Sequence, residues 1–142
     1  MGSAGDQMRK ELDEALCAKY PEIFRDRNGD MRETAMCWGF DCGDGWYNII
    51  DNLCATIQNR EYNNKRSKKE FAPVVATQVK EKYGSLRFYY SGGDDYVDGA
   101  VSLAECLSER TCEKCGAPGK MRGQGWYYTA CDEHTRDEDK EE

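Results

Sequence analysis

The feature that most constrains the fold is a pair of short cysteine and histidine motifs in the last third of the chain. Cys112 and Cys115 form the first motif, Cys131 and His134 form the second, and fifteen residues separate the two. Such pairs can bring three thiolates and one imidazole around a Zn²⁺ ion in the tetrahedral arrangement that this ion prefers. Because four protein ligands leave no open position for water, we expect a structural zinc ion. The alternative is a set of buried thiols or disulfides.

The segment between the two motifs is built to turn back on itself. Four glycines between residues 116 and 125 allow sharp turns, and residues 126–129 have the aromatic and β-branched composition of a returning strand. We therefore predict a zinc-binding hairpin over residues 111–134. Its topology, either a zinc ribbon or a treble clef, stays open at this point.

Four other cysteines, Cys17, Cys37, Cys42 and Cys54, lie in the first half of the chain. They could form a second metal site, but their spacing is irregular and no second histidine accompanies them. Cysteine is among the most frequently buried residue types, so buried free thiols are the favoured interpretation. The sequence shows no signal peptide and no apolar run that could span a bilayer, which predicts a reducing, cytoplasmic location.

Hydrophobic periodicity predicts two helices in the first half of the chain. Residues 6–20 carry a large apolar side chain at every fourth position, and a proline follows them. Residues 46–57 have an apolar helical face, and Asp44 is placed to cap the first turn. Residues 59–70 are polar and carry five bases and two acids, which predicts an exposed loop.

A β-hairpin and a third helix are predicted in the second half. Residues 74–90 form two β-rich runs that turn at Gly84, with Val75 and Val79 on one face. The third helix follows a Gly-Gly-Asp-Asp sequence, whose aspartates suit a helix start, and runs to about Arg110. Its buried stripe is expected to contain Val97, Val101, Ala104 and Leu107.

These elements predict a small α+β domain with three helices and a hairpin over residues 6–110. The zinc-binding hairpin of residues 111–134 is expected to pack on this domain. The acidic residues 135–142 are expected to fray, because they contain five acids and two bases and carry a net charge of −3.

One face of the predicted hairpin is cationic and aromatic. Its members are Lys80, Lys82, Arg87 and Tyr89, with Tyr83 and Trp46 as additional stacking residues. The basic residues 65–69 are expected to extend this surface. Cations contact phosphates and tyrosines stack on bases, which is the chemistry of a nucleotide or single-stranded nucleic-acid site. The alternative is a solvated sheet face.

Two properties of the chain argue against catalysis and against a polymeric nucleic acid as partner. The single histidine, His134, is assigned to the metal, so Ser-His and Cys-His nucleophile pairs are not available. The formal net charge of −7 disfavours binding of a long polyanion. We therefore expect a non-enzymatic protein that binds a small anionic ligand or another protein.

Several segments together resemble a family of small phage and prophage zinc-binding proteins that mostly lack an assigned function. The resemblance is carried by residues 42–47, 79–95, 111–119 and 123–134, and it covers roughly residues 36–134. The zinc-binding half, with its Cys-Glu-Lys-Cys-Gly-Ala-Pro-Gly and Cys-Asp-Glu-His sequences, is the most specific part.

The resemblance implies a phage accessory protein that acts in the cytoplasm of a bacterial host, and such proteins often counter host defences. Together with the cationic hairpin face, this suggests that the protein sequesters an anionic nucleotide that serves as a host immune signal. Two alternatives stay open. One is an inhibitor that binds a host defence or nucleic-acid enzyme through its acidic surface, and the other is a zinc-ribbon module that contacts DNA or RNA.

Overall fold

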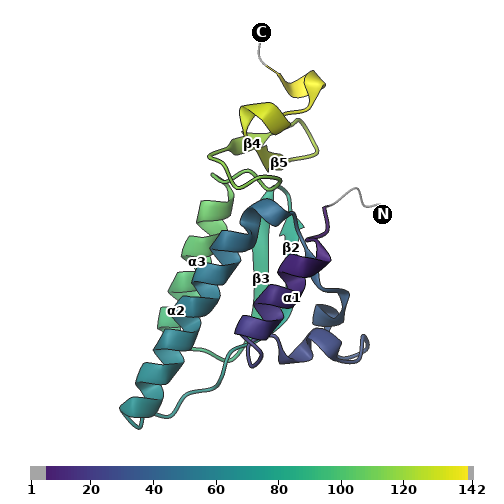
Figure 1. Ribbon diagram of the computed structural model, residues 1–142. Coiled ribbons are helices and arrows are strands. Elements are labelled where there is room, and N and C mark those ends of the chain that lie inside the picture. The colour runs from purple at the N-terminus through teal and green to yellow at the C-terminus, as the bar shows by residue number, and fades with distance from the viewer. Residues whose placement is uncertain (1–5, 141–142) are drawn as a thin grey trace.

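Within residues 6–140, which the computed structural model describes, three α-helices and a three-stranded sheet form the larger domain, and a two-stranded C-terminal lobe (residues 111–140) lies at one end (Figure 1). The helices are α1 (Lys10–Lys19), α2 (Tyr47–Arg66) and α3 (Asp95–Ser108). The strands are β1 (Phe40–Asp41), β2 (Val75–Lys82) and β3 (Ser85–Ser91) in the domain, and β4 (Lys120–Arg122) and β5 (Tyr128–Ala130) in the lobe. Short 3₁₀ helices connect them: η1 (Arg25–Asn28), η2 (Ala35–Trp38), η3 (Asp44–Trp46), η4 (Asp132–His134) and η5 (Asp137–Asp139). The predicted α+β class is confirmed.

The sheet is organised around β2, which is parallel to β1 and antiparallel to β3. β2 and β3 are joined by a two-residue turn at Tyr83 and Gly84, whose φ angles are 54° and 83°. Hairpin turns of this length commonly need positive φ at both positions. Gly84 adopts such a φ at no steric cost, whereas Tyr83 is a less common example of a side chain in that region. The predicted hairpin is thus present, with its turn at the predicted glycine.

The register of β2 against β3 shifts between Ala76 and Gln78, where an extra residue forms a β-bulge. The shift changes which side chains face the core. Ala76 and Val79 are both fully buried, whereas Val75 is half-buried. The prediction that Val75 and Val79 share one face is therefore wrong, because strict alternation holds only along an unbroken strand.

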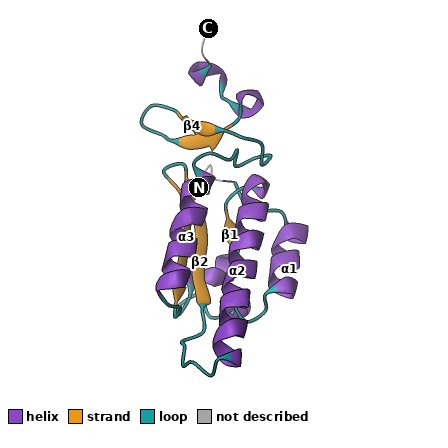
Figure 2. Cartoon of the chain, turned by 90° about the vertical axis from the view of Figure 1, so that its left-hand side faces the viewer, coloured by secondary structure: helices purple, strands orange, loops and turns teal. Residues whose placement is uncertain are grey.

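The helices lie along one face of the sheet, with α2 and α3 side by side (Figure 2). α1 is tied to α2 through Asp51, whose carboxylate accepts hydrogen bonds from Lys19 Nζ at 2.7 Å and from the Tyr20 hydroxyl at 2.6 Å. The largest fully buried hydrophobic side chains are Leu16, Met36, Phe40, Trp46, Ile50, Ile57, Val74, Val79, Leu86 and Val97. Full burial of such a side chain contributes about 1.5–3 kcal/mol, so this core is the main source of stability.

The outer edge of the sheet is covered by α3. Ser108 Oγ accepts a hydrogen bond from the Leu86 N–H at 2.9 Å, and Glu105 Oε2 accepts one from the Phe88 N–H at 3.0 Å. These two amides of β3 have no strand beside them, so side chains of α3 supply their partners. This pairing fixes α3 against the sheet.

α2 continues to Arg66, through much of the segment 59–70 that was predicted to be an exposed loop, so that prediction is wrong. Asn64 is buried, and Arg60 forms an ion pair with Asp94 at 2.9 Å. The basic residues of this stretch are also good helix formers. The helix therefore continues past the last of its predicted apolar residues, because its C-terminal part contacts the start of α3.

The first helix is shorter than predicted and Asp44 has a different role. α1 begins at Lys10, because the preceding segment is extended and the Met8 N–H donates to the Phe40 carbonyl at 3.1 Å. Asp44 does not cap α2. Its Oδ1 instead accepts a hydrogen bond from the Arg9 N–H at 2.9 Å, which joins the start of α1 to the start of α2.

The buried stripe of α3 differs from the prediction at one position. Val97, Val101 and Ala104 are buried as expected, whereas Leu107 is 46% exposed. The next residue, Ser108, is buried instead, because its hydroxyl accepts a hydrogen bond from the Leu86 N–H at the edge of the sheet. Leu107 is thus left on the outer surface of the helix.

Replacing Asp94 by alanine is expected to cost about 1–2 kcal/mol of unfolding free energy. The Asp94 carboxylate caps α3 by accepting the Val97 N–H at 3.0 Å, and it also binds Arg60. Chemical denaturation followed by circular dichroism measures the loss. Asp94→Asn should lose less, because an amide oxygen still caps the helix, and Asp95→Ala is the control. Equal stability of the Asp94→Ala and Asp95→Ala proteins would contradict the capping role.

Candidate metal centre

The four predicted metal ligands converge in the C-terminal lobe. The sulfur atoms of Cys112, Cys115 and Cys131 and a ring nitrogen of His134 all lie within 4.8 Å of one another. His134 Nδ1 lies 3.2 Å from Cys131 Sγ and 3.5 Å from Cys112 Sγ, and the Cys115 and Cys131 sulfurs are 3.7 Å apart. A tetrahedron with metal–sulfur bonds of about 2.3 Å has edges of about 3.8 Å. This cluster can therefore hold a metal ion.

Each ligand pair is held by local backbone hydrogen bonds. In the first pair, the Gly116 N–H donates to the Cys112 carbonyl at 2.9 Å, and Gly116 has a φ of 84° that favours glycine. In the second pair, the His134 N–H donates to the Cys131 carbonyl at 3.2 Å within the helical turn η4. The first pair thus lies in a tight turn, the knuckle of residues 112–116, and the second lies in the three-residue helix η4 after the β4–β5 hairpin.

Backbone N–H groups around the Cys112 sulfur favour its thiolate form. Burial would raise the pKa of the Cys112 thiol, but N–H groups of Cys131, Cys115 and Lys114 point at its sulfur and lower the pKa to about 6. The pKa of the Cys115 thiol is raised. The Ala117 N–H lowers this pKa, but burial and the neighbouring Cys112 and Cys131 thiols together outweigh that effect. Crowded sulfurs of this kind repel one another when ionised, and a bound metal cation removes that repulsion.

The knuckle is docked on the larger domain by the loop that precedes α2. The Gly43 N–H donates to Glu113 Oε2 at 2.8 Å, and the Gly45 N–H donates to the Glu113 carbonyl at 2.7 Å. Trp46 Nε1 donates to the Thr111 carbonyl at 2.9 Å. Burial raises the pKa of the Glu113 carboxyl to about 7, although the bond from Gly43 opposes this. This contact was not predicted from the sequence. The only sign of it in the sequence is the pair Gly43 and Gly45 on either side of Asp44.

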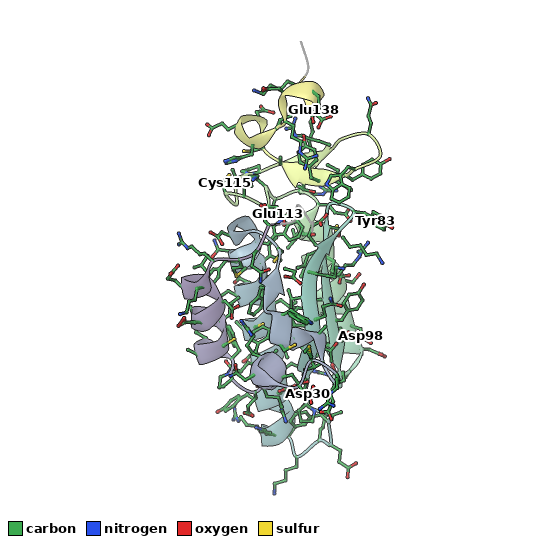
Figure 3. All side chains as sticks on the ribbon, turned by 90° about the vertical axis from the view of Figure 1, so that its right-hand side faces the viewer. Asp30, Tyr83, Asp98, Glu113, Cys115 and Glu138 are labelled. Atoms are coloured by element: carbon green, nitrogen blue, oxygen red, sulfur yellow. The ribbon has the colours of Figure 1, made fainter. Side chains whose placement is uncertain are left out.

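A second contact joins the lobe to the hairpin turn of the sheet. Thr129 is buried, and its hydroxyl donates to the Gly84 carbonyl at 2.6 Å. The Glu113 N–H donates to the Thr129 carbonyl at 3.1 Å, so the knuckle and β5 are linked at the same place. Figure 3 shows Glu113 and Tyr83 at the junction of lobe and sheet, with Cys115 on the lobe side. The lobe therefore contacts both the loop before α2 and the β2–β3 turn, next to the ligand cluster.

The segment after the second ligand pair, which was predicted to fray, contacts the lobe within the described residues. The Arg136 guanidinium lies 4.2 Å from the centroid of the Tyr128 ring. The Tyr128 hydroxyl accepts from the Arg136 N–H at 3.1 Å and donates to Asp139 Oδ2 at 2.5 Å. Residues 141–142 lie outside the described residues.

The predicted ligand surface has the expected register. Lys80 pairs with Arg87 across the two strands, and Gln78 pairs with Tyr89. Directly opposed residues of antiparallel strands point to the same face, and Lys82 follows Lys80 on that face. We call the surface formed by Gln78, Lys80, Lys82, Tyr83, Arg87 and Tyr89 the cationic face. It is turned away from the side of the sheet that α3 covers.

Two predicted parts of this surface lie elsewhere. Trp46 is fully buried under the lobe and cannot stack on a ligand, so that prediction is wrong. The basic residues 65–69 lie at the C-terminal end of α2, at the opposite end of the domain from the hairpin turn (Figure 1). Tyr83, by contrast, is 65% exposed, and Lys82 Nζ lies 5.7 Å from the centroid of its ring.

Comparisons with protein-family models, with curated proteins and with solved structures find no match. Among the described residues, no helix combines the length and the apolar character needed to cross a membrane. Inference about function therefore depends on the metal centre, the cationic face and the sequence resemblance.

The other cysteines of the first half do not gather into a second metal centre within residues 6–140. Cys42 and Cys54 are fully buried, and burial raises the pKa of each thiol, which keeps it protonated. Cys17 and Cys37 are half-buried and hydrogen-bond to nearby oxygens. These environments favour the interpretation as free thiols.

Proposed function

We propose that the protein is a non-enzymatic binding protein that holds an anionic nucleotide on the cationic face of its sheet. The observation that carries this proposal is the register of β2 and β3. It places Lys80, Lys82 and Arg87 together beside Tyr89, on the side of the sheet away from α3. Within the described chain, none of these three cations has a carboxylate at ion-pair distance. Burial raises the pKa of the Asp41 carboxyl, and Lys80, its register partner on β2, opposes that rise. Lys82 and Arg87 are thus the cations whose charge is most available to a ligand.

The shape and composition of the cationic face suit a small ligand. A shallow hollow of about 500 Å³ is lined by Lys80, Lys82 and Tyr89 together with Glu33, Thr34, Ala35, Thr77 and Gln78. Arg87 lies next to this lining, opposite Lys80 on β3. Tyr89 is 42% exposed and Tyr83 more so, which leaves ring surface for stacking on a base. Cations on two adjacent strands can contact more than one phosphate of the same ligand. The overall charge of −7 supports a nucleotide rather than a long nucleic acid.

The metal ion that we propose for the lobe is zinc. Three thiolates and one imidazole form a common structural zinc set, and softer sulfur ligands disfavour magnesium and calcium. With four protein ligands the ion would have no position for substrate or water. Its role would be to hold the lobe against the turn that carries Tyr83, next to the cationic face. The single histidine then has no free role in catalysis.

The biological role we propose is sequestration of a nucleotide immune signal in the cytoplasm of a bacterial host. The resemblance to small phage and prophage proteins supports this role, and the cationic face supplies the chemistry. Binding alone would block such a signal, so no reaction is required. An inhibitor of a host enzyme would instead need a protein partner.

Arg87→Ala is expected to weaken nucleotide binding by about 10- to 100-fold, because a charge-assisted hydrogen bond contributes about 1.5–3 kcal/mol. Isothermal titration calorimetry with a panel of cyclic oligonucleotides and ADP-ribose derivatives measures the effect. Arg66→Ala is the matched control, since Arg66 is an exposed arginine at the far end of α2. Absence of binding across the panel, or equal weakening by the control, would contradict the proposal.

A further inference from the structure

We propose that the protein forms a two-fold symmetric dimer through the outer face of α3. This face carries a stripe of residues that recur every three or four positions and therefore lie on one side of the helix. The α3 stripe consists of Tyr96, Gly99, Leu103, Cys106 and Leu107, and Arg110 continues it in the turn that follows the helix. Leu103 is 60% exposed and Leu107 is 46% exposed, one turn apart. Adjacent exposed leucines of this kind are typical of a surface that another chain covers.

A groove between α2 and α3 adjoins the stripe and enlarges the apolar surface. It has a volume of about 320 Å³ and is lined mainly by apolar atoms, with Ile49 and Leu53 on one wall and Leu103 and Leu107 on the other. In Figure 2 both helices face the viewer, and no other described helix or strand lies over them. The apolar surface is thus accessible to a second molecule.

Gly99 has no role in the fold of the single chain. A glycine inside a helix costs about 1 kcal/mol relative to alanine. A Cβ atom added at Gly99 would meet no atom within 4 Å, so nothing in the described chain requires its absence. The glycine leaves a hollow on the exposed face, one turn before Leu103. A side chain from another molecule can fill that hollow.

The α3 stripe is self-complementary about Leu103. In an antiparallel pairing with a two-fold axis at this residue, positions equally far before and after Leu103 face each other. Gly99 lies four residues before Leu103, and Leu107 lies four residues after it. Leu107 of the second copy would therefore enter the hollow at Gly99, and the reverse contact would form as well. Leu103 would pack against its own equivalent at the axis.

The two ends of the stripe carry opposite charges, with Asp95 beside Tyr96 at one end and Arg110 at the other. Tyr96 lies seven residues before Leu103 and Arg110 seven residues after it, so these two side chains would meet. Asp95 lies next to Tyr96, and within the described chain neither Asp95 nor Arg110 has an ion-pair partner. This complementarity favours a second copy over an unrelated partner.

Analytical ultracentrifugation of the full, metal-loaded chain in reducing buffer tests the dimer. We expect a dimer whose dissociation constant rises about 100-fold or more in Leu103→Lys, because two lysines would then be buried at the axis. Met31→Lys is the matched control, since Met31 is 64% exposed and lies outside α3. Thermal unfolding checks that both variants remain folded. A wild-type protein that stays monomeric, or a dimer that survives Leu103→Lys, overturns the proposal.

Disulfide trapping tests the register. In a Cys106→Ser background, Leu103→Cys is expected to form a cross-linked dimer on mild oxidation, because the two cysteines would face each other at the axis. Leu107→Cys in the same background is the control. Its two copies would lie about 12 Å apart along the helices, too far for a disulfide. Equal cross-linking of both variants would overturn the antiparallel register centred on Leu103.

Discussion

Cys131→Ser is expected to abolish metal binding and to unfold the C-terminal lobe. Cys131 supplies one of the four ligand atoms and contacts the ligand atoms of both His134 and Cys115. A serine hydroxyl does not replace a thiolate at a zinc centre. The lobe has little core of its own, because Cys112 and Ala130 are its buried apolar residues within the described chain. In small zinc domains the metal contributes on the order of 10 kcal/mol to folding, so loss of one ligand should exceed what the remaining contacts supply.

Elemental analysis and limited proteolysis measure this effect. We expect one zinc ion per chain in the wild-type protein, none in Cys131→Ser, and rapid cleavage within residues 111–140 of the variant. Cys106→Ser is the control, since Cys106 is an exposed cysteine of α3 outside the cluster, and it should keep its metal. Stoichiometric metal in Cys131→Ser would show that the four side chains do not form the site.

Gly45→Ala is expected to destabilise the protein by about 3 kcal/mol or more. A Cβ atom at Gly45 would lie 2.1 Å from the Cys112 carbonyl oxygen and 2.6 Å from the carbonyl group of Glu113. All of these are backbone atoms, so no side-chain rotation relieves the overlap. The loop would have to leave the knuckle. That movement would also break the bond from Trp46 Nε1 to the Thr111 carbonyl, which leaves a buried donor unpaired.

Denaturant unfolding of Gly45→Ala measures the loss, and a second glycine provides the control. Gly99→Ala adds the same methyl group where no atom lies within 4 Å, so it should gain up to about 1 kcal/mol from helix propensity. Both variants are compared in the Leu103→Lys background, which removes any contribution from dimer formation. If Gly45→Ala stays within about 0.5 kcal/mol of its parent, the loop is not seated on the knuckle.

Local sequence patterns were enough to predict several elements. The spacing of Cys112, Cys115, Cys131 and His134 indicated the metal cluster, because each ligand pair is set by a short turn. The hairpin turn at Gly84 followed from a glycine between two β-rich runs. The start of α3 followed from the aspartates beside its first turn, one of which caps the helix. In each case the decisive interaction joins residues close in sequence.

Interactions between distant segments could not be predicted in this way. Trp46 lies 65 residues before Thr111, whose carbonyl accepts its hydrogen bond. The sequence placed Trp46 on an apolar helical face, but it could not show that the lobe buries this side chain. The extension of α2 depends on contacts of Arg60 and Asn64 with the start of α3. The bulge near Ala76 depends on pairing with β3, and no residue of β2 signals it.

The hydrogen bonds from Leu86 and Phe88 to side chains of α3 limit how the sheet can grow. An extended peptide, or the same strand of a misfolded molecule, could add to β3 only after Glu105 and Ser108 release the two amides. The opposite border is β1, which is only two residues long and offers a poor template. Fibril-like growth is therefore opposed at both borders of the sheet while α3 stays folded.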